Sequence, residues 1–78
     1  MARYWVVSGI LKEVDLDENK IVLDVSGPDS WPDLKDFSLS DEIRRKLEEM
    51  GDDIMEYLDK EITLKLKDGI VVDIEFPE

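Results

Sequence analysis

The side chains that most often perform chemistry in proteins are scarce in this sequence. Histidine, the commonest general base and metal ligand, is absent, and so is cysteine, which excludes a thiolate nucleophile and a disulfide framework. Serine occurs, but without histidine no serine has the usual partner that activates its hydroxyl. The carboxylates lie mostly in expected turns and at helix starts, where structure already accounts for them. We therefore expect a protein that is not an enzyme, with no catalytic residue and no cofactor.

The segment Asp15 to Asn19, DLDEN, is the nearest approach to a metal motif. Carboxylates at alternate positions can converge on one hard cation such as calcium. A calcium loop needs glycine at its sixth position and glutamate at its twelfth, and these positions hold Lys20 and Ser26. The segment is therefore interpreted as an acidic turn, and no metal site is predicted.

Three side chains are candidates for contact with a partner: Trp5, Trp31 and Lys35. Trp31 stands between polar residues and before a proline, in the loop segment 26–33. It is either a lid packed over an open end of the core or an exposed anchor for another molecule. In so small a chain we favour the lid. Lys35 is expected to point outward from a strand, and Trp5 lies in the first strand.

The charge balance limits the choice of partner. Twenty-one acidic and ten basic side chains give a net charge of −11, which repels phosphate backbones and disfavours general binding of nucleic acid. The same charge speeds encounter with a basic protein. Charged residues make up 40% of the chain, with one asparagine and no glutamine, a profile typical of a thermophilic source or a designed sequence.

Chain length and apolar patterning indicate one domain, residues 1–78. A chain of this size buries only ~60% of its unfolded surface, so nearly every apolar residue in a strand or helix must serve the core. The N-terminus lacks the apolar region of a signal peptide, and no apolar run approaches the ~20 residues of a membrane span. We expect a cytoplasmic protein with no membrane partner.

The three candidate residues must be positioned by strands and helices arranged around the longest apolar stretch, Arg3 to Leu16. Its aromatic and β-branched residues are typical of a strand, and the single Gly9 predicts a bend or bulge where the strand turns a corner between two sheets. Apolar residues occupy both faces, so we expect both faces to be covered inside a small closed barrel. The alternative is a long hairpin arm that tolerates a glycine.

Further elements follow from periodicity and from turn and cap signals. In order we expect strands at 3–16, 21–25 and 34–39, a helix at 41–50, a short second helix through Leu58, and strands at 61–67 and 70–76. Gly51 separates the two helices, although one continuous kinked helix is the alternative.

Two hairpin registers can be predicted from the apolar positions. In the first hairpin, the loop 17–20 pairs Leu16 with Ile21. In the last hairpin, a two-residue turn at Asp68-Gly69 would place an acid opposite Leu64 on the core face. A three-residue loop, Lys67–Gly69, is therefore predicted instead, because it places an apolar residue there.

The predicted order is three strands, a helical segment and two strands, a mainly β chain of the α+β class. This topology resembles that of the five-stranded oligonucleotide/oligosaccharide-binding (OB) barrel. The alternative is a β-grasp fold, ββαββ, in which residues 33–39 are only a linker. A shared fold does not by itself imply a shared function.

A non-catalytic module for protein–protein interaction is the expected function. One alternative is a protein that binds single-stranded nucleic acid through an OB barrel, although the outward residues expected on the second and third strands lack aromatic side chains. The other alternative is a stable scaffold, natural or designed, with no evolved partner.

Overall fold

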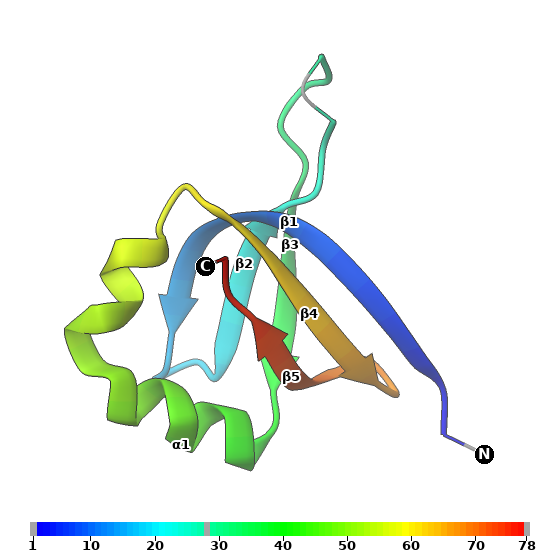
Figure 1. Ribbon diagram of the computed structural model, residues 1–78. Coiled ribbons are helices and arrows are strands. Elements are labelled where there is room, and N and C mark those ends of the chain that lie inside the picture. Colours follow the sequence, from blue (N-terminus) through cyan, green and yellow to red (C-terminus); the bar gives the residue numbers. More distant parts are fainter. Residues whose placement is uncertain (1, 28, 78) are drawn as a thin grey trace.

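The computed structural model describes residues 2–27 and 29–77 and is mainly β, with one helical segment (Figure 1). In chain order the elements are β1 (Tyr4–Asp15), β2 (Lys20–Asp24), β3 (Leu34–Leu39), α1 (Asp41–Met50), the 3-10 helix η1 (Gly51–Tyr57), β4 (Glu61–Lys67) and β5 (Ile70–Glu75). The order of strands and helices predicted from the sequence is confirmed. None of the helices in the described part of the chain is long and apolar enough to cross a membrane.

The sheet closes into a ring in the strand order β1-β2-β3-β5-β4, with β4 returning to β1. Neighbouring strands are antiparallel except β3 and β5, which run parallel and pair only at Ser38 with Ile70 and Leu39 with Val71. Residues 34–39 are thus a strand with partners on both sides. The β-grasp alternative, which requires residues 33–39 to be only a linker, is therefore wrong.

The first strand bends because it belongs to both sides of the ring. Its first part, Tyr4 to Ile10, pairs with β4, and its last part, from Ile10 onward, pairs with β2. At the junction β2 crosses so close to Gly9 that a Cβ atom there would lie 2.7 Å from the backbone oxygen of Asp24. The corner predicted at Gly9 is confirmed. The ladder irregularity itself falls later, between Leu11 and Glu13.

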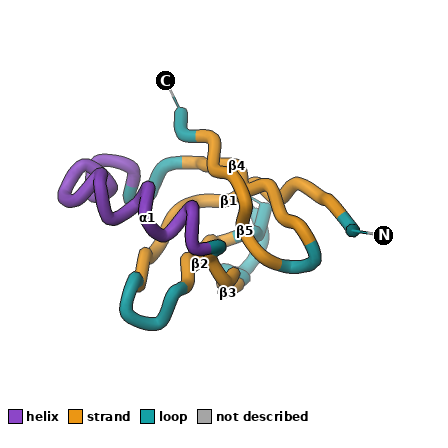
Figure 2. The backbone as a smooth tube through the Cα atoms, turned by 90° about the horizontal axis from the view of Figure 1, so that it is seen from below, coloured by secondary structure: helices purple, strands orange, loops and turns teal. Residues whose placement is uncertain are grey.

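The helical segment contributes to one apolar core together with the inner faces of the strands. Ser40 caps α1, since its hydroxyl accepts a hydrogen bond from the amide of Ile43 at 3.3 Å. Ile43 and Leu47 on α1 and Ile54 on η1 are buried against the strands. Figures 1 and 2 show that α1 lies on the opposite side of the ring from the long β2–β3 loop. The predicted helix bounds 41–50 are confirmed.

The predicted register of the first hairpin is wrong by two residues. Val14, and not Leu16, lies opposite Ile21. Asn19 fixes this register: its φ is 57°, and its side-chain amide donates to the carbonyl of Leu39 at 2.8 Å. A shift of two residues keeps every side chain on its predicted face, so the inward residues were identified correctly although their partners were not.

The predicted register of the last hairpin is also wrong. The two-residue turn Asp68-Gly69 forms, with φ angles of 52° and 83°. A bulge that leaves Val72 without a ladder partner then shifts the pairing, so that Leu64 lies opposite Ile74 and not opposite Asp73. The extra residue removes the acid from the core face, and that acid was the reason for rejecting this turn.

Candidate partner-binding surface

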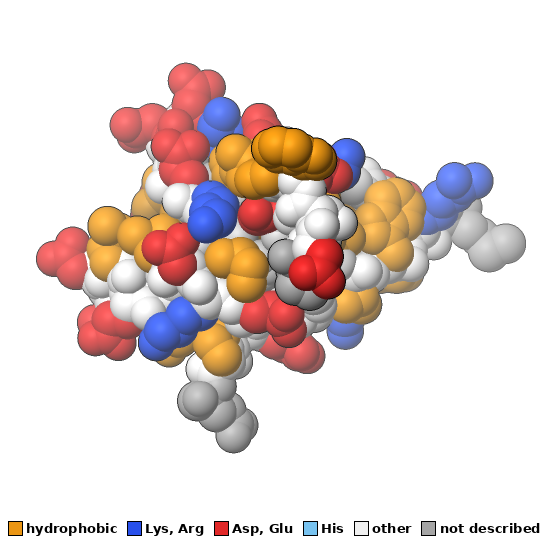
Figure 3. All heavy atoms as spheres, turned by 90° about the horizontal axis from the view of Figure 1, so that it is seen from above, with side chains coloured by type: hydrophobic (Ala, Val, Ile, Leu, Met, Phe, Trp, Pro, Cys, Tyr) orange, Lys and Arg blue, Asp and Glu red, His pale blue; other side chains and the backbone are white. Residues whose placement is uncertain are grey.

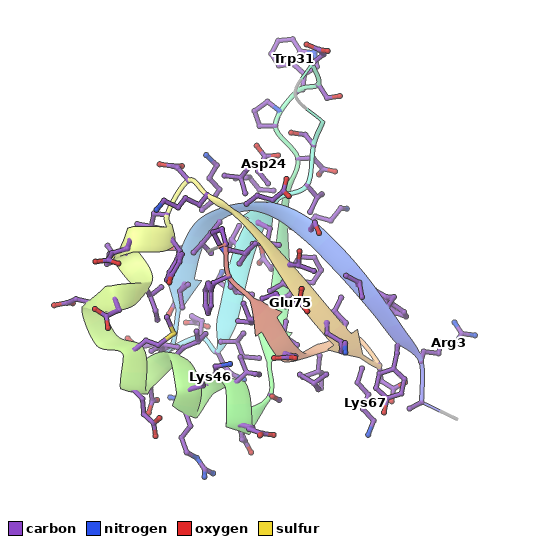
Figure 4. The ribbon with its side chains drawn as sticks, viewed as in Figure 1. Arg3, Asp24, Trp31, Lys46, Lys67 and Glu75 are labelled. Atoms are coloured by element: carbon purple, nitrogen blue, oxygen red, sulfur yellow. The ribbon has the colours of Figure 1, made fainter. Side chains whose placement is uncertain are left out.

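Trp31 lies near the tip of the β2–β3 loop, which rises away from the ring (Figures 1 and 4). Its side chain is 91% exposed. The lid interpretation is therefore wrong, and the anchor interpretation stays a prediction. The physical reason is that the loop forms its hydrogen bonds within its own stem and does not fold back over the core.

The stem of this loop is held by the carboxylate of Asp24. One of its oxygens accepts hydrogen bonds from the amide of Ser26 at 2.9 Å, the hydroxyl of Ser26 at 2.5 Å and the amide of Asp33 at 3.3 Å. The amide of Val25 also donates to the carbonyl of Asp33 at 3.0 Å. The hydrogen bond from the Ser26 hydroxyl, followed by those from the amides, lowers the pKa of Asp24. The exposed Trp31 is therefore carried by a loop whose stem is held by hydrogen bonds.

Trp5 lies on β1 opposite Leu66, on the side of the sheet that faces the core. It is nevertheless 46% exposed, because it sits near the start of the strand, where the ring ends. Trp5 therefore lies close to Lys67, which follows Leu66, and to Arg3, two residues before it. Figure 4 shows Arg3 and Lys67 far from Trp31. The two tryptophans therefore do not form one patch.

Lys35 lies on β3 opposite Leu23, a fully buried residue. Directly opposed residues share a face, so Lys35 is on the inner side of its strand and the predicted outward placement is wrong. It is exposed all the same, because β3 pairs with β5 only at Ser38 and Leu39. Lys35 belongs to the region at the base of the Trp31 loop.

The outer face of β1, β2 and β3 is acidic. According to the ladders, its charged residues are Glu13, Asp15, Lys20, Asp24 and Asp36. Lys20 is itself paired with Asp36, at 3.6 Å. The apolar side chains on this face are aliphatic and not aromatic: Leu34 is exposed, whereas Val22 is buried. On the face of the molecule seen in Figure 3, acidic side chains are dispersed, with apolar ones exposed between them.

The lysines do not gather into one positive patch. Lys12 forms an ion pair with Asp59 at 2.9 Å, and this hydrogen bond raises the pKa of Lys12. Lys65 and Lys67 project from the outer face of β4, where Val6 and Tyr4 of β1 lie opposite them. The ammonium of Lys67 lies 5.9 Å from the centre of the Tyr4 ring.

Sequence reasoning missed the exposure of the first half of β1. Tyr4 is 62% exposed and Val6 is 61% exposed, although both faces of this strand were expected to be covered. The helical segment lies elsewhere on the ring and leaves this outer face bare (Figure 1). Ser8, a polar residue at the next position on the same face, was the available signal; its hydroxyl lies 2.9 Å from that of Thr63.

Within residues 2–27 and 29–77, no group of three or more acidic side chains is placed to hold a metal ion. Comparisons of the chain with known protein families, with curated protein sequences and with solved structures give no match. The assignment of function therefore depends on the geometry of the surface.

Proposed function

We propose that this chain is a small OB-like barrel that acts as a non-catalytic module for protein–protein interaction. The ring order β1-β2-β3-β5-β4, with the helical segment between β3 and β4, supports the OB-like assignment. The bend of β1 at Gly9 supports it too, because one strand then serves both halves of the ring.

The observation that carries the proposed interaction is the exposure of Trp31 on a hydrogen-bonded stem. A tryptophan side chain buries roughly 200 Å² when it enters an apolar pocket, worth about 5 kcal/mol before the costs of association. Because the stem is already held by Asp24, little ordering of the loop base remains to oppose binding. Exposed, preorganised tryptophans are typical anchors at protein interfaces.

The charges around the anchor favour a basic partner. Asp24, Asp29, Asp33 and Asp36 lie in or beside the β2–β3 loop, and the whole chain carries a net charge of −11. A partner with an apolar pocket rimmed by lysine or arginine would match both features. Lys35, at the base of the loop, could pair with a single acid on the same partner.

Single-stranded nucleic acid is the alternative ligand, and the surface opposes it. Stacking of bases needs exposed aromatic rings, and phosphate contacts need cations. The outer face of β2 and β3 carries carboxylates and aliphatic side chains, and its one lysine, Lys20, is paired with Asp36. Trp31 alone could stack on a base, but it does so next to an acidic stem.

The test compares wild type with Trp31→Ala and with Met55→Ala, a control that removes apolar surface from η1, where Met55 is 61% exposed. Proteins retained by each immobilised variant would be identified, and the affinity of a purified partner measured. We expect Trp31→Ala to weaken binding by more than about 2 kcal/mol, roughly thirtyfold, and Met55→Ala to leave it unchanged. Urea unfolding should give the same midpoint for all three.

Two outcomes would contradict the proposal. If wild type and Trp31→Ala retain the same proteins with the same affinity, the anchor is wrong and the scaffold alternative gains. If single-stranded DNA or RNA at low salt produces saturable, salt-sensitive shifts of amides on β2 and β3, the chain is a nucleic-acid-binding barrel despite its charge.

A further inference from the structure

The first half of β1 has a free backbone edge. The carbonyl of Arg3 accepts from the amide of Asp68 at 2.8 Å, and the amide of Leu11 donates to the carbonyl of Lys60 at 2.9 Å. The ladder between β1 and β4 is regular between these points. Odd-numbered residues of β1 therefore direct their amides and carbonyls toward β4, and the intervening residues direct theirs the opposite way.

Tyr4, Val6 and Ser8 thus point their backbone donors and acceptors away from β4. Among the described residues no strand pairs with them on that side, because β2 joins β1 only from Ile10 onward. We call the segment Tyr4 to Ser8 the β1 edge. In Figure 1 this part of β1 extends beyond the point where β2 ends and the β2–β3 loop begins.

Four of the five side chains of the β1 edge are apolar, and three of these are exposed. Tyr4, Trp5 and Val6 are consecutive, and each has about half or more of its surface exposed. Proteins usually protect such an edge with a charged residue, a proline or a bulge within the strand. Between Tyr4 and Ser8 there is neither a charge nor a proline, and the ladder to β4 has no bulge.

We propose that the β1 edge is the site where a second copy of this chain adds its own β1 edge, antiparallel, about a twofold axis at Val6. In this register Val6 lies opposite Val6 of the second copy, and Tyr4 lies opposite Ser8. Each of these pairs has its amide and carbonyl directed at the other, so each exchanges two hydrogen bonds. Trp5 lies opposite Val7, and apolar residues meet with no like charges directly opposed.

The ends of the same register are complementary in charge. Arg3 comes opposite Gly9 of the second copy. Gly9 lines an open hollow of about 500 Å³, which is also lined by Asp24 and Glu61. The backbone of Arg3 is held to Asp68, since its amide donates to that carboxylate at 2.9 Å, while its side chain extends away from the ring (Figure 4).

Twofold symmetry brings Arg3 alongside the acidic hollow twice, once in each direction, so the attraction acts across the edge of the sheet and not through a direct side-chain contact. Two attractions at the rim oppose the repulsion between chains that each carry a net charge of −11. A foreign strand could use the same backbone groups, but it would have to supply both the apolar sequence and a cation at the matching position. The second copy already has both.

The test measures the mass of the full chain by sedimentation over a range of concentrations. Wild type should pass from monomer to dimer. Val6→Lys places two lysines opposite each other at the axis and should raise the dissociation constant by about a hundredfold. Met55→Lys is the matched control, because Met55 has the same exposed fraction, 61%, on η1, and it should behave as wild type. Urea unfolding at low concentration confirms that both variants fold.

A second measurement tests the register. The chain has no cysteine, so Val6→Cys introduces a single thiol. Opposed residues of a hydrogen-bonded pair have Cα atoms about 5.5 Å apart, within reach of a disulfide. Mild oxidation should therefore cross-link Val6→Cys rapidly and Met55→Cys slowly.

The proposal is overturned if wild type remains monomeric at millimolar concentration, or if it forms a dimer that Val6→Lys leaves intact. It is also overturned if the monomer binds an added extended peptide with amide shifts at Tyr4 to Ser8, since the edge would then serve a foreign strand. Trp31 does not belong to the β1 edge and does not line the hollow beside Gly9, although Ser26, Gly27, Ser30 and Pro32 of its loop do. Trp31→Ala should therefore leave the dimer unchanged, and failure of either proposal is distinguishable from failure of the other.

Discussion

Gly9→Ala should destabilise the domain, because the bend of β1 brings a second backbone into the place of the missing side chain. The added Cβ would lie 2.7 Å from the carbonyl oxygen of Asp24 and 3.2 Å from the Cβ of Leu23. Favourable contacts between carbon and a carbonyl oxygen lie at about 3.3 to 3.6 Å, so β1 and β2 must separate by roughly 0.6 Å. Overpacking of this kind costs about 1 to 3 kcal/mol.

The control for this substitution is Gly27→Ala. Any glycine-to-alanine change also restricts the unfolded chain, which stabilises the native state by about 0.4 to 1 kcal/mol. Among the described residues, a Cβ on Gly27 would meet only the Ser30 hydroxyl, at an ordinary 3.7 Å, so this variant serves as the reference for the unfolded-state effect. The difference between the two variants isolates the clash.

Urea unfolding followed by circular dichroism gives the free energy of unfolding for both variants, and a thermal melt gives a second reading. We expect Gly9→Ala to be less stable than Gly27→Ala by about 1 to 3 kcal/mol, which corresponds to a fall in Tm of roughly 4 to 24 °C for a domain of this size. Equal stabilities would refute the reasoning, since they would show that β2 does not cross β1 at Gly9.

Two further predictions concern the loops. The pKa of Asp24 is lowered in the folded chain, so the stabilisation that it gives to the loop stem is present above pH about 3.8 and is lost as the pH falls through the folded pKa. The Ser26 amide shift should therefore titrate with a midpoint below 3.8, and Asp24→Asn should abolish the transition; a midpoint at or above 3.8 would contradict this. In the last hairpin, Asp68 has a positive φ. Asp68→Val should be less stable than Asp68→Ala by about 1 kcal/mol in urea, because a β-branched residue is strained there, and equal stabilities would argue for the three-residue loop.

Local patterns in the sequence were sufficient to predict the elements. Alternation of apolar residues identified the strands, and the capping signal at Ser40 with the stop at Gly51 identified α1. The registers of the two hairpins were not predictable in this way. Each depends on the backbone conformation or the pairing of one residue, and the alternation of apolar residues does not indicate either. Asn19 adopts a positive φ in one hairpin, and Val72 drops out of the ladder in the other.

The candidate site was predicted only as a set of residue types. Trp31 was identified as a lid or an anchor, and the choice depended on the direction of the loop, which Asp24 sets by accepting hydrogen bonds from within the stem. Nothing in the local sequence shows which carboxylate does this. The β1 edge was missed for a related reason: a strand that bends between two neighbours leaves part of one side unpaired, and this depends on where β2 departs.

The ring also constrains the order in which the chain can fold. The first half of β1 has its ladder partner on β4, and the joined hydroxyls of Ser8 and Thr63 are 55 residues apart in sequence. During synthesis, both sides of the segment Tyr4 to Ser8 therefore stay unpaired until β4 has left the ribosome. Pairings between distant residues form slowly, because the entropy cost of closing a long loop comes before any favourable contact is made. The longest of the described strands is thus the one that is exposed longest to chaperones and to other nascent chains.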